Sequence, residues 1–193
     1  MTSIISARGL TKRYGRMVAV DHIDLEIPPG RIVGLIGPNG AGKTSALKAI
    51  LGLATFDGQL SVMGKNPSRD RAKLMEDVCF IADVAVLPRW IRVNQLLDVT
   101  EQIHSGFSRD TCMEYLAQTK ITLNQKVKQL SKGMVAQLHL ALVMAIDARL
   151  LVLDEPTLGL DILYRKKFYS SLLNDYFDEQ RTILITTHQV EEV

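Results

Sequence analysis

The residues best suited to chemistry form a loop near the start of the chain, GPNGAGKT at positions 37–44, which fits the spacing GxxxxGK(S/T). Glycines in such a loop let successive backbone N–H groups point inward around an anion, and a helix that begins inside the loop adds its positive dipole end. The lysine reaches the β- and γ-phosphates of a nucleotide, and the hydroxyl after it binds Mg²⁺. The spacing therefore predicts a phosphate-binding loop made of Gly37, Pro38, Asn39, Gly40, Ala41, Gly42, Lys43, Thr44 and Ser45.

Two adjacent carboxylates form the second group. Asp154 and Glu155 follow the uninterrupted apolar run 150–153, which is typical of a buried parallel strand, and open parallel sheets bind ligands at the carboxyl ends of their strands. Asp154 is suited to holding Mg²⁺ through its water shell, and Glu155 to polarising a water that attacks the γ-phosphate. Alone, a glycine loop or an acidic pair could be a structural turn or a helix cap. Together they favour a Mg²⁺-dependent site that binds and hydrolyses ATP.

The apolar periodicity predicts which elements position these residues. Strands are expected where apolar residues alternate or run without interruption, and helices where they recur every three or four residues. The expected strands cover residues 4–10, 22–27, 31–36, 59–63, 78–82, 150–153 and 182–186. The expected helices cover residues 43–53, 93–103, 109–116, 133–146 and 162–177.

This order of elements predicts one α/β domain over residues 1–193, because the chain is long enough for a single sizeable core. We expect a phosphate-loop NTPase core with a mixed parallel sheet, an antiparallel β subdomain at the N-terminus and an inserted α-helical subdomain. Residues 1–82 and 147–193 are assigned to the core with its β subdomain. Residues from about 83 to 146 are assigned to the helical subdomain.

The composition excludes several classes of function. A net charge of +2 with 23% charged residues gives no basic surface for nucleic acid, so no nucleic-acid partner is expected. The sequence has neither a signal-peptide pattern nor an apolar run of about 18 residues, which indicates a cytoplasmic location. Cys79 and Cys112 lie in apolar runs without metal-ligand spacing and are expected to be reduced packing residues.

A third segment, LSKGM at positions 130–134, gives the sequence its family resemblance. It resembles the LSGGQ signature of the ATP-binding cassette (ABC) ATPases, and the likeness extends from Tyr14 to His188. Lys132 and Met134 depart from the signature in the way of the branch that exports drugs, antibiotics and polysaccharides. The resemblance implies that Ser131 and Gly133 contact the γ-phosphate held by a second subunit. Without it, Ser131 is only the N-cap of a helix.

Three further residues match the family in order. Tyr14 resembles the aromatic residue that stacks on adenine, although an edge aromatic packed near Val20 is the alternative. Asp161 resembles the residue of the inter-subunit loop, and it is also placed to cap the next helix. His188 resembles the histidine that senses the γ-phosphate, with a structural histidine at a strand end as the alternative.

The sequence departs from the family at two places. Asp83 stands where a glutamine is usual, so it keeps oxygen ligands for Mg²⁺ and joins Thr44 and Asp154 as a candidate metal ligand. The chain ends at residue 193, where the family continues through a helix and further strands, so it looks short at its C-terminus.

The resemblance implies the ATP-binding and ATP-hydrolysing subunit of an exporter, with Lys43, Glu155 and His188 as catalytic residues. Two copies, or one copy and a second cassette, would close around two ATP molecules and drive a transmembrane permease from the cytoplasmic face of the membrane. The alternatives are a non-transport cassette that acts on ribosomes or DNA, and a nucleotide-binding partner without effective hydrolysis. The first usually has two cassettes or a coiled coil, and neither is present here.

Overall fold

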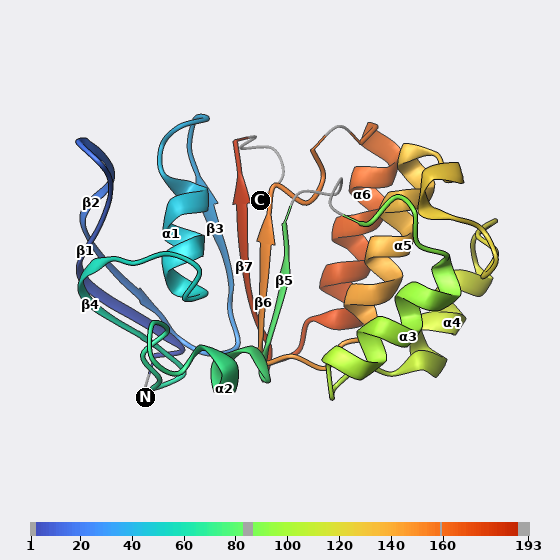
Figure 1. Ribbon diagram of the computed structural model, residues 1–193, viewed down its shortest axis with the longest axis horizontal. Coiled ribbons are helices and arrows are strands. Elements are labelled where there is room, and N and C mark those ends of the chain that lie inside the picture. Colours follow the sequence, from blue (N-terminus) through green and yellow to red (C-terminus); the bar gives the residue numbers. More distant parts are fainter. Residues whose placement is uncertain (1–2, 83–86, 159, 189–193) are drawn as a thin grey trace. The chain divides into compact units, whose positions relative to one another are not determined.

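The computed structural model (Figure 1) describes residues 3–82, 87–158 and 160–188. Its chain divides into two units. The first, here called the core unit, consists of residues 1–80, 149–155 and 178–193. The second, the helical unit, consists of residues 81–148 and 156–177.

An antiparallel sheet of three strands begins the core unit. It contains β1 (Ile5–Tyr14), β2 (Met17–Ile27) and β4 (Asp57–Val62) in the order β2-β1-β4. β2 starts five residues before the predicted strand 22–27, because a tight turn through Gly15, at a φ of 59°, joins it to β1. The residues after that turn do not alternate between apolar and polar, so the sequence pattern missed them. The predicted antiparallel β subdomain is present.

A second sheet carries the elements that lead to the candidate site. Its strands are β3 (Ile32–Ile36), β5 (Val78–Ile81), β6 (Leu150–Asp154) and β7 (Thr182–Thr187), in the order β3-β7-β6-β5. β7 runs parallel to both β3 and β6, with Ile36 paired to Thr187 and Asp154 to Thr186. The carboxyl ends of three neighbouring strands therefore meet at one edge of the sheet.

Helix α1 (Lys43–Ile50) lies between the two sheets and joins them into one core (Figure 1). Its residues Leu47 and Ile50 are fully buried in a cluster with Leu10 of β1 and Val152 of β6. α1 ends three residues before the predicted boundary. The core unit also contains the five-residue helix α2 (Arg71–Met75), which the sequence analysis did not predict because it is too short to show a period.

The helical unit is built from longer helices around its own core. They are α3 (Val93–Ile103), α4 (Arg109–Ala117), the 3₁₀ turn η1 (Val127–Gln129), α5 (Lys132–Met144), α6 (Ile162–Ser171) and the π-helical turn η2 (Leu172–Tyr176). α6 and η2 group with this unit, whereas the sequence division placed residues 147–193 in the core. The reason is local packing, because Tyr176 is buried and its hydroxyl donates to Ile146 O at 3.1 Å.

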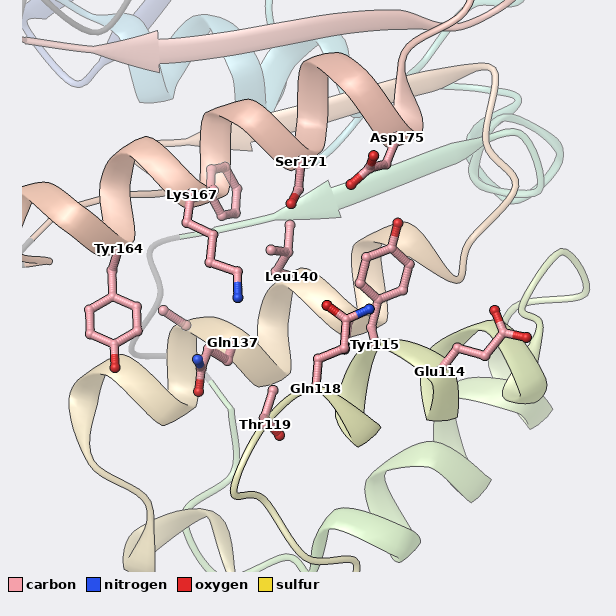
Figure 2. Close-up of a pocket in the computed structure, with 13 residues that line it drawn as sticks. Glu114, Tyr115, Gln118, Thr119, Gln137, Leu140, Tyr164, Lys167, Ser171 and Asp175 are labelled. Atoms are coloured by element: carbon pink, nitrogen blue, oxygen red, sulfur yellow. The ribbon is translucent and has the colours of Figure 1, made fainter.

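Helices α4, α5 and α6, with η2, leave a hollow of about 300 Å³ between them (Figure 2). Polar groups such as Lys167 and Asp175 line it, together with the apolar side chain of Leu140. Burial, reinforced by the carboxylates of Asp175 and Glu114, raises the pKa of Tyr115. The Tyr115 hydroxyl therefore stays protonated at neutral pH.

The two cysteines are free and buried, as predicted. Burial raises the pKa of Cys79 and of Cys112 to about 12, so both are unreactive thiols at neutral pH. Within the described residues, no helix has the length and apolar character needed to cross a membrane.

Buried His139 of α5 makes the stability of the chain depend on pH. Its side chain is only 6% exposed, and burial lowers its pKa to about 4 from 6.5. The unfolded chain therefore takes up a proton between these two values and the folded chain does not, so stability is complete above pH 6.5 and falls as the pH drops toward 4. By pH 5 the loss should reach about 2 kcal/mol.

Urea unfolding at pH 7 and pH 5 measures this effect. His139→Leu should remove the difference, because leucine fills a similar volume and does not titrate. His22→Asn is the matched control, since His22 is exposed and asparagine tolerates its positive φ of 46°. If the free energy of unfolding falls by the same amount from pH 7 to pH 5 in wild type and in His139→Leu, this prediction is wrong.

Candidate active site

The glycine loop lies between β3 and α1, and its backbone needs glycine. Gly40 and Gly42 have φ angles of 86° and 91°, in the region that side chains disfavour. A Cβ on Gly42 would also lie 2.1 Å from the carbonyl oxygen of Ala19 on β2. Gly42 is the N-cap of α1 and provides no side-chain cap, so the first N–H groups of the helix stay available to an anion.

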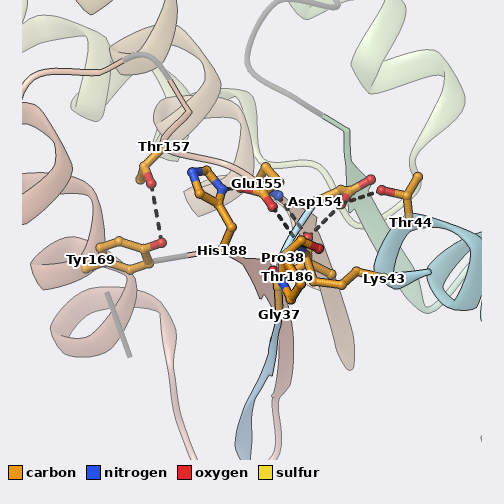
Figure 3. Close-up of polar contacts among 10 residues, drawn as sticks. All are labelled: Gly37, Pro38, Lys43, Thr44, Asp154, Glu155, Thr157, Tyr169, Thr186 and His188. Atoms are coloured by element: carbon orange, nitrogen blue, oxygen red, sulfur yellow. Dashed lines mark hydrogen bonds and ion pairs between the residues drawn. The ribbon is translucent and has the colours of Figure 1, made fainter. Parts of the chain in front are cut away.

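Lys43 folds back over this loop (Figure 3). Its Nζ donates to the carbonyl oxygens of Gly37 at 2.6 Å and Pro38 at 3.3 Å. The same nitrogen lies 3.3 Å from Oε1 of Glu155, and the lysine side chain is only 10% exposed. The ammonium group is therefore held over the loop, where a bound phosphate would meet it.

Asp154 ends β6 and lies between two hydroxyl groups. Its Oδ1 accepts hydrogen bonds from Thr44 at 3.2 Å and from Thr186 at 2.6 Å. The first threonine comes from α1 and the second from β7, so three elements converge on one carboxylate oxygen. Mg²⁺ prefers oxygen ligands and takes few of them from the protein when phosphates and water supply the rest. The Thr44 and Asp154 oxygens fit that pattern.

Glu155 follows Asp154 in a left-handed backbone conformation, with a φ of 50°. Its backbone N–H donates to Oγ1 of Thr186 at 3.0 Å, which compensates part of the strain. Its side chain is 16% exposed and reaches in two directions, with Oε1 at Lys43 and Oε2 at 2.6 Å from Nδ1 of His188. The structure thus brings the predicted Lys43, Glu155 and His188 together.

A hollow of about 290 Å³ opens beside the loop. Its lining joins loop and α1 residues with Glu155 and with three residues of β2, namely Met17, Val18 and Ala19. Tyr14 is not among its lining residues. The Tyr14 ring instead has Nζ of Lys12 at 4.8 Å from its centroid, and it stands opposite Met17 in the sheet. The adenine-stacking role of Tyr14 remains a prediction.

The candidate signature at positions 130–134 and Asp161 of the candidate inter-subunit loop belong to the helical unit. Ser131 caps α5, because its Oγ accepts from the N–H of Met134 at 3.2 Å. Asp161 caps α6 through Oδ1, which accepts from Leu163 at 3.0 Å. Both capping alternatives are therefore present. Asp83 lies outside the described residues.

Two groups of site residues were missed from the sequence. The sequence pattern predicts Thr186 only as part of a strand, although a hydroxyl beside the carboxyl end of an apolar strand is a usable signal. Met17, Val18 and Ala19 were missed because their strand was predicted to begin later. The other described residues of the candidate loop and acidic pair lie together as expected.

The parallel sheet, the glycine loop that opens α1 and the acidic pair at the end of β6 define a phosphate-loop nucleotide-binding domain. The chain belongs to the ABC transporter family, because the family model described as "ABC transporter" matches residues 20–158. The family resemblance and the predicted fold class are confirmed.

Individual relatives agree with this assignment. The Nod factor export ATP-binding protein I of Cupriavidus metallidurans is 35% identical over 205 residues, which cover 100% of this chain and 65% of the relative. The chain thus spans less than two thirds of that relative's length. Among solved structures, cbiO1 of Clostridium perfringens, part of the ABC transporter complex cbiONQ, aligns with a TM-score of 0.78 and 23% identity over 100% of this chain and 81% of that one. The structure of an ATP-binding subunit of an ABC transporter aligns with a TM-score of 0.84 and 23% identity, covering 98% and 81%.

Proposed function

We propose that this chain binds ATP with Mg²⁺, hydrolyses it as a dimer and thereby drives export through a membrane-spanning permease. The observation that carries the proposal is the position of Glu155, whose carboxylate contacts both Lys43 and His188 at the carboxyl edge of the parallel sheet. A site for binding alone needs the loop and its lysine. A carboxylate held beside them adds the group that hydrolysis requires.

In the proposed mechanism the loop N–H groups and the start of α1 hold the phosphates, and Lys43 contacts the β- and γ-phosphates. Glu155 orients the attacking water and accepts its proton, while His188 holds the carboxylate through Oε2. Mg²⁺, held by Thr44 and Asp154, would neutralise charge on the phosphate oxygens. Tyr14 and the apolar residues of β2 are the candidates for contact with the adenine ring of the nucleotide.

The proposed dimer completes each site with the second copy. Ser131 and Gly133 of one copy would contact the γ-phosphate bound by the other, with Asp161 in the loop between the copies. The core unit would contain the residues that bind and hydrolyse ATP, and the helical unit would contain the signature. The direction of transport is supported by the name of a relative, the Nod factor export ATP-binding protein. The position on the cytoplasmic face of the membrane is part of the proposal.

Mixing two inactive variants tests the composite site. Lys43→Ala removes the loop cation, and Ser131→Arg blocks the signature at an exposed position. Each variant alone should release no phosphate. A mixed dimer, however, contains one site with an intact loop and an intact signature, so equal amounts of the two should recover up to about a quarter of wild-type turnover.

The outcome separates the proposal from its alternatives. A mixture that forms dimers by light scattering and stays inactive contradicts the composite site. If the wild-type chain binds nucleotide in the presence of Mg²⁺ and releases no phosphate, the reading as a hydrolysis-deficient partner is correct instead.

A further inference from the structure

Gly133 of the signature packs directly against an aromatic side chain of the same chain. A Cβ on Gly133 would lie 2.9 Å from Cε2 and 3.0 Å from Cζ of Tyr164. Gly133 lies in the first turn of α5 with an ordinary helical backbone, so the glycine serves a close approach and not an unusual φ. Glycine is the least favourable helix residue after proline, and at this position it leaves room for the Tyr164 ring.

Tyr164 is fixed from two sides. Its backbone N–H donates at 3.1 Å to Oδ1 of Asp161, which caps α6. Its side chain packs against Ala136 and Leu160. Figure 2 shows the ring projecting from α6 toward the beginning of α5. The capping carboxylate, the ring and Gly133 thus form a continuous set of contacts within the helical unit.

We propose that Tyr164 is the positioning residue of the signature, and that its ring sets the place of the turn at Gly133 relative to Asp161. The inference rests on the proposed function, in which both segments face a second copy. Tyr164 contacts no nucleotide in this role. Its effect is that the signature and the inter-subunit loop approach the second copy in one fixed arrangement.

A double-mutant cycle tests the contact between Gly133 and Tyr164 through stability, without an activity assay. Gly133→Ala forces the ring to move and should lower the melting temperature of the full chain by about 3 °C. In a Tyr164→Ala background the obstacle is absent and alanine is the better helix former, so the same change should raise the melting temperature by about 1–2 °C. A shift of the same sign and size in both backgrounds overturns the proposal.

Kinetics then test the positioning role. Tyr164→Ala should lower kcat at least tenfold. The affinity of the monomeric chain for a fluorescent ATP analogue should stay within twofold, because the loop of one copy binds that analogue without the second copy. Tyr164→Phe keeps the ring and should restore kcat, since in the described part of the chain the Tyr164 hydroxyl has no hydrogen-bond partner. Unchanged kcat in Tyr164→Ala overturns the proposal.

The two proposals fail separately. A wild-type chain that releases no phosphate contradicts the proposed function, and the melting-temperature cycle still supports or overturns the positioning contact. Conversely, a cycle with equal shifts overturns the role of Tyr164 while wild-type hydrolysis continues.

Discussion

Glu155→Gln should lower the rate of phosphate release by about 10²–10⁴-fold, the range that a positioned general base contributes. The amide has nearly the shape of the carboxylate, so the contacts to Lys43 and His188 keep their geometry. What disappears is the negative charge that accepts a proton from water. The loss should appear in kcat, measured by phosphate release with saturating ATP and Mg²⁺.

Nucleotide affinity should rise in the same variant. Glu155 lies 3.3 Å from Nζ of Lys43, so a bound phosphate competes with its carboxylate for the ammonium group. Glutamine weakens that competition, and the ATP-bound variant should accumulate as a dimer. Glu179→Gln removes an exposed carboxylate of the same unit and serves as the control. Wild-type turnover in Glu155→Gln excludes Glu155 as the base.

Lys43→Ala should reduce affinity for ATP by about 10²-fold or more, because truncating one partner of a buried charged contact costs 2–5 kcal/mol or more. The structure holds Nζ over the loop with hydrogen bonds to Gly37 and Pro38. No other cation lines the described part of this hollow. Titration with a fluorescent ATP analogue measures the loss.

Lys48→Ala is the matched control for this prediction. Lys48 lies on the same helix, is exposed and is not among the residues that line the hollow. The two variants have the same composition and charge, so a general charge effect would weaken both equally. Only a specific contact with phosphate weakens Lys43→Ala alone.

Local sequence patterns predicted the elements in which an apolar repeat extends over several turns and the motifs in which the residue spacing is strict. The helix at 93–103 was predicted to the residue, because its apolar side chains repeat over three turns. The start of β2 was missed because Met17, Val18 and Ala19 lack alternation. The grouping of α6 and η2 with the helical unit depends on contacts such as that of Tyr176 in η2 with Ile146, which no local pattern encodes.

In the candidate site, too, some residues could be predicted from the sequence and others needed the structure. Motif spacing identified Lys43, Asp154 and Glu155, and the register of β6 against β7 explains why His188 reaches Glu155. The role of Thr186 depends on its pairing with Asp154, which is 32 residues away in the sequence, so it needed the structure. Its hydroxyl donates to Asp154 and accepts from the N–H of Glu155.

The contact between Gly42 and Ala19 also determines how wide the hollow can be. Both groups belong to the backbone, so no change of side-chain rotamer separates the loop from β2. Met17 and Val18, on the same strand, also line the hollow. We therefore expect the distance between the loop and the β2 residues of the hollow to change little unless β2 itself moves. We therefore expect the hollow to select ligands by length as well as by charge.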